Sequence, residues 1–123
     1  MTITHVSELY DMEDDAFNRA VAVLDGAIII KFSTFSAMCI KDGWGAPRPV
    51  PDYAHDLNAA WTLALPRSVK RGVYGGYMDN EDAVAHVVAY HFSATETHAT
   101  PARALSTAWA AWKLAQMAQE AGA

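Results

Sequence analysis

The stretch Ala83–Phe92 (AVAHVVAYHF) places the strongest constraint on the fold, because it is a strand pattern that is apolar on both faces. Successive side chains of a strand point to opposite faces. Val84, Val88, Tyr90 and Phe92 share one face, and Ala85, Val87 and Ala89, which are small enough to lie under a helix, share the other. We therefore expect a central strand, with a helix packed on the face of small residues.

Two helices are predicted before this strand. The first covers Met12–Asp25, begins after an N-cap at Asp11 and ends at Gly26. Its apolar face is expected to consist of Phe17, Ala20, Val21 and Leu24. The second runs from Tyr53 to Leu65, between a cap at Asp52 and a stop at Pro66. Its buried side is expected to consist of Leu57, Ala60, Trp61 and Ala64.

A third helix is predicted near the end of the sequence. Thr100 is its expected cap, and Pro101 stands at the first helical position, where the missing N–H is tolerated. The helix extends to about Glu120. Its inward stripe is expected to be Leu105, Ala108, Trp109, Trp112 and Ala115.

Further strands are predicted from β-branched composition and turn signals. Ala27–Phe32 (AIIIKF) and Ala37–Lys41 (AMCIK) form an expected hairpin, and Val69–Met78 is a strand weakened by glycines. Residues 45–51 contain three prolines and are an extended loop, and residues 79–82 are a turn. The expected fold is a single α+β domain spanning residues 1–123, an antiparallel β-sheet of 3–5 strands packed with about three helices as a sandwich.

Charge and composition exclude several functional classes. The formal net charge is -5, which disfavours direct nucleic-acid binding because such binding needs Lys and Arg to neutralise phosphates. No apolar run is long enough to span a bilayer. Cys39 is the only cysteine, so no internal disulfide and no Cys-x-x-Cys zinc motif exist. These features predict a cytoplasmic protein that does not bind membranes.

Three segments, taken in order, resemble a known family. They are Asn18–Ala22 (NRAVA), Pro51–Trp61 (PDYAHDLNAAW) and Ala99–Leu105 (ATPARAL). This pattern is similar to that of the phage ABA sandwich domain family, small proteins of tailed phages and prophages. Ala54 stands where that family has Ser, and Gly26-Ala27 stands where it often has Gly-Trp. The resemblance implies a phage origin and an antiparallel sheet packed with helices, and it implies no catalytic residues.

Few residues suggest catalysis or metal binding. His86, His91, Glu96 and His98 lie close in sequence and form the one candidate metal site. However, His86 and His91 are expected on opposite faces of a strand, and His98 in a loop, so we favour structural or surface roles for these residues. Cys39 lies in an apolar strand and is expected to be a buried, unreactive thiol. No cofactor is expected, and His5 and His55 are expected on the surface.

Other residues are candidates for binding a partner. The carboxylates Asp11, Glu13, Asp14 and Asp15, and the second group Asp79, Glu81 and Asp82, either cap and solvate local structure or form a contact surface for a basic protein. Trp44 and Tyr53 flank the proline loop and Arg48 projects from it. Exposed aromatic and arginine side chains are common interface anchors, and Tyr74 and Tyr77 are further candidates. Ordinary packing is the alternative for all of these aromatic residues.

Three functional hypotheses follow from these features. The preferred one is a non-catalytic phage or prophage accessory protein in the cytoplasm of a bacterial host. It binds and inhibits a host protein complex, in particular a nucleic-acid-binding defence complex, as an anti-CRISPR protein does. The second is a virion assembly component, for which a homo-oligomer is compatible. The third is a small metal-dependent domain that uses the histidine-rich region.

Overall fold

The computed structural model describes residues 3–31, 37–68, 73–79, 82–89, 92–98 and 100–122. Side chains are described for all of these residues except residue 31, residues 64–68, the strand residues between 73 and 95, Thr97 and Gly122. The helices are a 3-10 helix η1 (Val6–Leu9), α1 (Asp14–Leu24), α2 (Leu57–Ser68) and α3 (Pro101–Gly122). The strands are β1 (Ile28–Lys31), β2 (Ala37–Ile40), β3 (Arg48–Pro49), β4 (Val73–Asp79), β5 (Asp82–Ala89) and β6 (Phe92–His98).

The strands form two three-stranded antiparallel sheets, ordered β1-β2-β3 and β4-β5-β6. The prediction of an α+β fold with antiparallel strands and about three helices is confirmed. The predicted central position of the Ala83–Phe92 strand is also confirmed, since β5 lies between β4 and β6. The predicted hairpin is β1 paired with β2. Among the helices of the described residues, none has the length and apolar character needed to cross a membrane.

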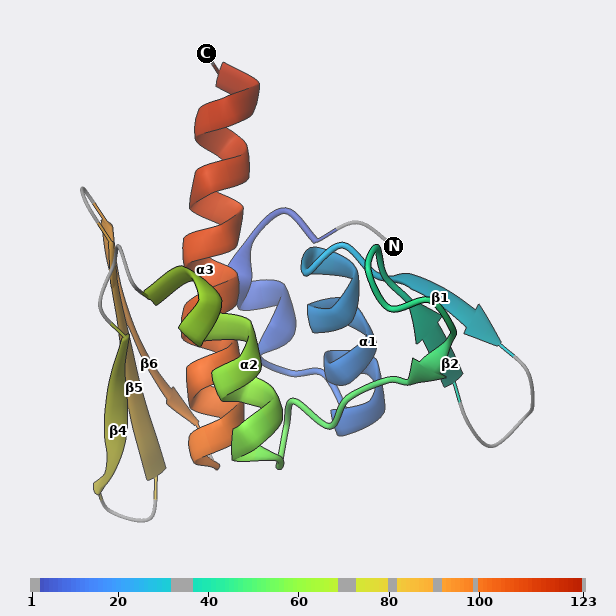
Figure 1. Cartoon of the computed structure of the whole chain (residues 1–123). Coiled ribbons are helices and arrows are strands. Elements are labelled where there is room, and N and C mark those ends of the chain that lie inside the picture. The colour runs from blue at the N-terminus through green and yellow to red at the C-terminus, as the bar shows by residue number, and fades with distance from the viewer. Residues whose placement is uncertain are drawn as a thin grey trace.

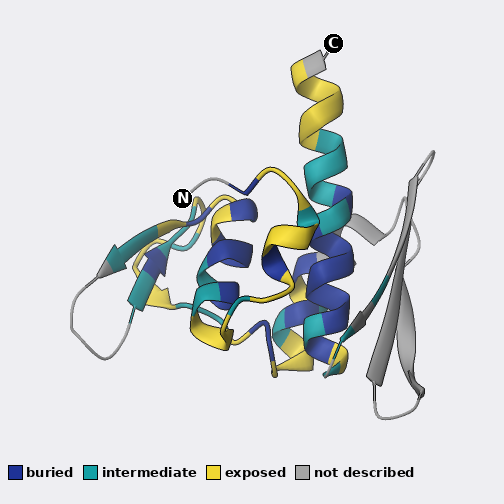
Figure 2. Ribbon diagram, turned by 180° about the vertical axis from the view of Figure 1, so that it is seen from behind, coloured by how far each residue is buried: buried dark blue, intermediate teal, exposed yellow. Residues whose placement is uncertain are grey.

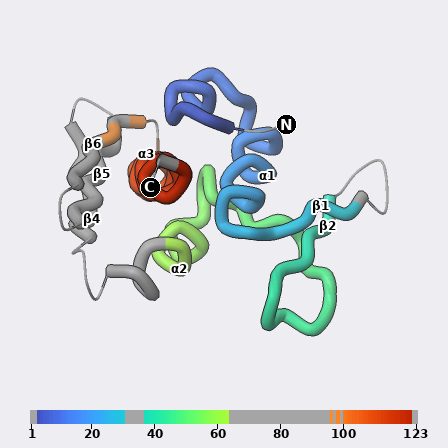
Figure 3. The backbone as a smooth tube through the Cα atoms, turned by 90° about the horizontal axis from the view of Figure 1, so that it is seen from above, coloured from blue at the N-terminus to red at the C-terminus, as the bar shows by residue number. Residues whose placement is uncertain are grey.

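Helix α3 is the centre of the molecule (Figure 1). It packs against β5 and β6 on one side and against α2, η1 and α1 on the other, an arrangement that Figure 3 shows from above for the helices. Its buried residues include Leu105, Ala108, Trp109 and Trp112, as predicted, while Ala115 is only partly buried. Small alanines on this helix allow neighbouring elements to approach it closely, and Figure 2 shows its lower turns buried.

Helix α1 begins later than predicted. Its N-cap is Glu13, not Asp11, and the side chain of Glu13 makes no capping hydrogen bond. Asp14 and Asp15 occupy the first turn, where the helix dipole favours negative charge. Gly26 ends the segment as predicted, with a φ of 94° that a residue with a Cβ rarely adopts.

Helix α2 begins four residues later than a cap at Asp52 implies. Asp52 instead anchors a turn, its carbonyl accepting the N–H of His55 and of Asp56. The true cap is Asp56, whose carboxylate accepts the N–H of Asn58. As the first helical residue, Leu57 is 42% exposed, contrary to the prediction that it is buried.

The far end of α2 also differs from the prediction. The helix continues to Ser68, so Pro66 does not stop it. A proline near the C-terminal end of a helix removes only one hydrogen bond. Ala60 and Leu63 form the buried side, and Trp61 is partly buried.

Two predictions about the second sheet need correction. The predicted strand Ala83–Phe92 is two strands, because Ala89 pairs with Phe92 across the end of a hairpin. The region around His98, predicted to be a loop, is β6. This strand is polar (FSATETH), so its formation depends on pairing with β5 and not on an apolar pattern that the sequence reveals.

The three segments that carry the family resemblance meet in one hydrogen-bonded cluster. Asn18 donates to Asp52 Oδ1 over 3.1 Å through its side-chain nitrogen, and its side-chain oxygen accepts the N–H of Ala54 over 2.9 Å. The Thr100 hydroxyl donates to the carbonyl of Ala54 and accepts the N–H of Arg103, which confirms Thr100 as the cap of α3. The turn at residues 52–54 is therefore held by α1 on one side and α3 on the other.

Arg103 holds the start of α1 against α3. Its guanidinium donates to the carbonyls of Leu9 and Met12 over 3.1 and 2.7 Å and to Asp14 over 3.0 Å. It also lies over the ring of Phe17, with its central carbon 4.3 Å from the ring centroid. One side chain thus satisfies two carbonyls, pairs a carboxylate and covers a buried aromatic ring.

Candidate protein-interaction site

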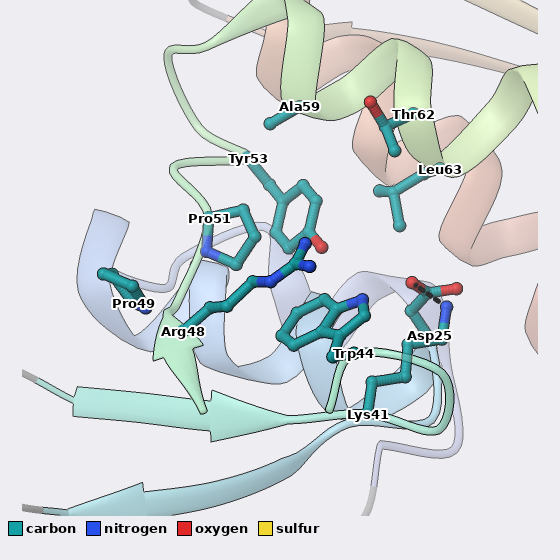
Figure 4. Close-up of a pocket in the computed structure, with 10 residues that line it drawn as sticks. All are labelled: Asp25, Lys41, Trp44, Arg48, Pro49, Pro51, Tyr53, Ala59, Thr62 and Leu63. Atoms are coloured by element: carbon teal, nitrogen blue, oxygen red, sulfur yellow. Dashed lines mark hydrogen bonds and ion pairs between the residues drawn. The ribbon is translucent and has the colours of Figure 1, made fainter. Parts of the chain in front are cut away.

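A cleft lies between the loop that follows β2 and the N-terminal half of α2. Its volume is about 580 Å³, and the ten residues that line it are drawn in Figure 4. Trp44 and Arg48, two predicted partner-binding residues, stand on one wall, so we call it the Trp44–Arg48 cleft. On the opposite wall, the sequence marks only Tyr53, which flanks the proline loop.

The first wall is built by turns and prolines. Gly43 and Gly45 have φ angles of 91° and 76°, which let the chain reverse on both sides of Trp44. The Trp44 ring packs partly buried against the core. Pro49 lies on the outer strand β3, at the edge of its sheet, where a missing N–H removes no ladder bond. The loop thus fixes Trp44 and Arg48 side by side.

Arg48 lies across Trp44, with the guanidinium carbon 4.9 Å from the ring centroid. This stacking holds the cation in place while the N–H groups at its edge remain able to donate hydrogen bonds. Figure 4 shows the guanidinium extending into the middle of the cleft, toward Tyr53. Among the described residues, Arg48 makes no ion pair with a carboxylate.

The second wall consists of Tyr53 and residues of α2. Tyr53 is 5% exposed, so of its two predicted roles, ordinary packing and an exposed interface anchor, packing is confirmed. Its carbonyl accepts a hydrogen bond from Ser106 of α3 over 3.1 Å, so the hydrogen-bonded cluster described above positions this ring. Burial, and secondarily the nearby Asp25 carboxylate, raise the pKa of the Tyr53 phenol. Leu63 completes an apolar surface beside it.

The charges in the cleft are partly paired. Lys41 Nζ lies 2.8 Å from Asp25 Oδ2, and the Asp25 side chain is only 10% exposed. This partly buried pair neutralises Lys41, and Arg48 is the remaining cation among the described residues that line the cleft. The cleft is therefore a locally positive, largely apolar hollow on a chain whose net charge is -5. An apolar side chain adjacent to a carboxylate matches that environment.

The first predicted acidic cluster is exposed, but one of its members, Asp14, already contacts basic side chains of the same chain. Asp14 is bound by Arg103 at 3.0 Å and by His55 Nε2 at 3.2 Å. Asp11, Glu13 and Asp15 are exposed at the start of α1. Within the part of the chain that the structure describes, these three carboxylates form no ion pair and remain available to a partner.

The remaining predicted partner-binding residues lie on the β4–β5 hairpin. Asp79 pairs with Asp82 at its end, and Glu81 lies outside the described residues. The register shifts between Tyr74 and Tyr77, an irregularity of the bulge type in a strand whose glycines weaken regular pairing. The structure describes the backbone of Tyr74, Tyr77, Asp79 and Asp82.

The histidine-rich region forms a hydrogen-bonded group with Tyr10 of the N-terminal segment. His98 Nε2 lies 3.0 Å from Glu96 Oε1, and the Tyr10 hydroxyl donates to Glu96 Oε2 over 3.1 Å. The Tyr10 and His98 rings are 5.4 Å apart. Burial, followed by the Glu96 carboxylate, raises the pKa of the Tyr10 phenol. Tyr10 lies 86 residues before Glu96, and no sequence signal links them.

No group of three or more metal-ligating side chains occurs among the residues that the structure describes. His91 lies outside those residues, and only the backbone of His86 is described, paired with Thr95. Cys39 is fully buried as predicted, and burial raises the pKa of its thiol. His5 and His55 are exposed, also as predicted.

Comparison of the chain with family models, with curated proteins and with solved structures found no match.

Proposed function

We propose that this chain is a non-catalytic binding protein that holds a side chain of a larger protein in the Trp44–Arg48 cleft. The observation that carries this proposal is the arrangement of Arg48, stacked 4.9 Å above Trp44 and facing a wall of Tyr53 and Leu63. Aromatic and arginine groups around a partly enclosed hollow are typical of interface hot spots.

The cleft favours a partner segment in which an apolar side chain adjoins a carboxylate. The apolar group would pack between Trp44, Tyr53 and Leu63, where it displaces water from apolar surface. The carboxylate would accept two hydrogen bonds from the edge of the Arg48 guanidinium. Such a bidentate pair fixes orientation, because both partners are planar.

The narrower proposal is a phage or prophage accessory protein that inhibits a host defence complex in the bacterial cytoplasm, as an anti-CRISPR protein does. The resemblance of three segments to the phage ABA sandwich family and the small size of the chain support it. Asp11, Glu13 and Asp15 would face a basic surface of the complex and compete with nucleic acid there. The cleft would then anchor the chain beside that surface.

Affinity capture from a host that carries a defence system tests the use of the cleft. Wild type, Trp44→Ala, Arg48→Glu and the control Arg19→Glu are compared. The control makes the same charge change on α1, outside the cleft. We expect wild type and Arg19→Glu to capture the same complex, and the two cleft variants to lose it. Equal capture by all four variants would refute the cleft as the binding site.

Phage growth tests the inhibitor role. Expression of the chain in the same host should restore plating of a phage that the defence system restricts, and Arg48→Glu should not restore it. No restoration by wild type would defeat the inhibitor proposal. Several copies of the chain in purified phage particles, measured by mass spectrometry, would favour a virion component instead.

A further inference from the structure

The C-terminal turns of α3 extend beyond the rest of the molecule. Residues 102–112 are almost entirely buried, residues 113–116 are partly buried, and residues 117–121 are exposed. Figures 1 and 2 show this end of the helix standing clear of the other elements. At 1.5 Å per residue, the ten residues from 113 to 122 span roughly 15 Å.

The side chains of this segment are separated by polarity. A helix turns by about 100° per residue, so residues three and four apart share a face. One face carries only apolar side chains, those of Leu114, Ala115, Met117, Ala118 and Ala121. Leu114 packs against the core and Ala115 is partly buried, so the exposed part of this face is Met117, Ala118 and Ala121. The opposite face carries Lys113, Gln116, Gln119 and Glu120.

Met117 is the largest exposed side chain of the apolar face, with 42% of its surface exposed, and it lies midway along this segment of the helix. In proteins, a helix gains most of its stability from packing of such a face, and short helices without packing are marginal in water. The apolar face at the end of α3 therefore favours a covering partner.

The charges on this segment indicate which kind of partner covers the apolar face. Lys113 and Glu120 lie seven residues apart, two turns along the same flank of the apolar face. If two copies of the helix pack antiparallel about a two-fold axis near Met117, Lys113 of each copy lies opposite Glu120 of the other. In a parallel pair this flank would instead face the partner's other flank, which carries Ala115 and Gln119, so neither charge would gain an opposite charge.

We propose that the C-terminal turns of α3 form an antiparallel dimer contact between two copies of this chain. The contact is isologous, so each copy uses the same surface and the assembly closes as a dimer. Its area is well below the ~800 Å² per partner of a standard-size interface. We therefore expect a dimer dissociation constant in the micromolar to millimolar range.

Sedimentation equilibrium of the full chain, from 10 µM to 1 mM at low salt, tests the contact. We expect wild type to dimerise, and Met117→Asp to weaken dimerisation by about a hundredfold through burial of a charge. Lys113→Glu and Glu120→Lys should each weaken it roughly tenfold, because two attractive pairs become repulsive. Circular dichroism checks that each variant folds, as expected for changes at partly or fully exposed positions.

Restoration by charge exchange makes the test specific. The double variant, with both charges reversed, should dimerise within about threefold of wild type. An equal mixture of the two single variants should form heterodimers, because the two carboxylates of the Lys113→Glu chain then face the two ammonium groups of the Glu120→Lys chain. Wild type that stays monomeric at 1 mM, or a dimer that none of these changes affects, would overturn the proposal.

Discussion

Replacement of Asn18 by alanine should destabilise the chain by about 2–3 kcal/mol, because the N–H of Ala54 is left without its acceptor. Asn18 is 8% exposed and Ala54 is 1% exposed, so water has little access to that N–H. A buried N–H without an acceptor costs about 1–3 kcal/mol, and the lost bond to Asp52 adds about 1 kcal/mol. Asp52 is half exposed, which limits its share.

Urea unfolding followed by tryptophan fluorescence and circular dichroism measures this loss. With a slope of about 1–3 kcal/mol/M for a small protein, the midpoint should fall by roughly 0.7–3 M at unchanged slope. Asn58→Ala is the matched control, because Asn58 is exposed at the start of α2. It should change stability by no more than about 0.5 kcal/mol. If Asn18→Ala unfolds at the same midpoint as Asn58→Ala, Asn18 does not hold the turn at residues 52–54.

Asn18→Asp separates the two roles of this side chain. It keeps an oxygen for the Ala54 N–H but places a second carboxylate beside Asp52. Two adjacent carboxylates raise each other's pKa in the folded state. The variant is therefore most stable at low pH, where one of the two is protonated, and it loses stability as the pH rises through the raised pKa. The deficit of Asn18→Asp relative to wild type should therefore shrink as the pH falls from about 7 toward 4. A deficit independent of pH would contradict the contact with Asp52.

Two further predictions concern groups whose pKa the fold shifts. The Cys39 thiol is fully buried, and burial raises its pKa. It should therefore react with a disulfide reagent at pH 8 roughly a hundredfold or more slower in the native chain than in urea. Native and unfolded rates within about tenfold of each other would show that the thiol is accessible. The backbone N–H groups of Thr4 and His5 donate to the Glu8 carboxylate over 2.8 and 3.2 Å and lower its pKa. The ionised carboxylate therefore stabilises η1 above the unfolded pKa of Glu8, and this stabilisation is lost as the pH falls through the lower folded pKa. Carbon NMR of the Glu8 carboxyl should give a titration midpoint below about 4.3, whereas a midpoint at that value would mean that these hydrogen bonds do not persist in solution.

The candidate site was only partly predictable. Trp44 and Arg48 stand four residues apart beside a proline loop, and the sequence alone marks them as a pair of interface candidates. Asp25 and Leu63 line the same cleft but belong to segments far from that loop. No local pattern connects them, because their approach depends on how α1 and α2 pack around α3.

The sequence by itself determined the elements whose signals are local. Thr100 and Pro101 mark the start of α3, and the β-branched run before Lys31 and the small residues of β5 mark strands, because caps, periodicity and branching act within a few residues. Only the tertiary structure decided that β6 is a strand and that α2 begins at Leu57. Tertiary contacts also put the Asp14 carboxylate beside Arg103. Each of these outcomes depends on which distant group satisfies a backbone hydrogen bond or a charge, and that choice is made when the chain packs.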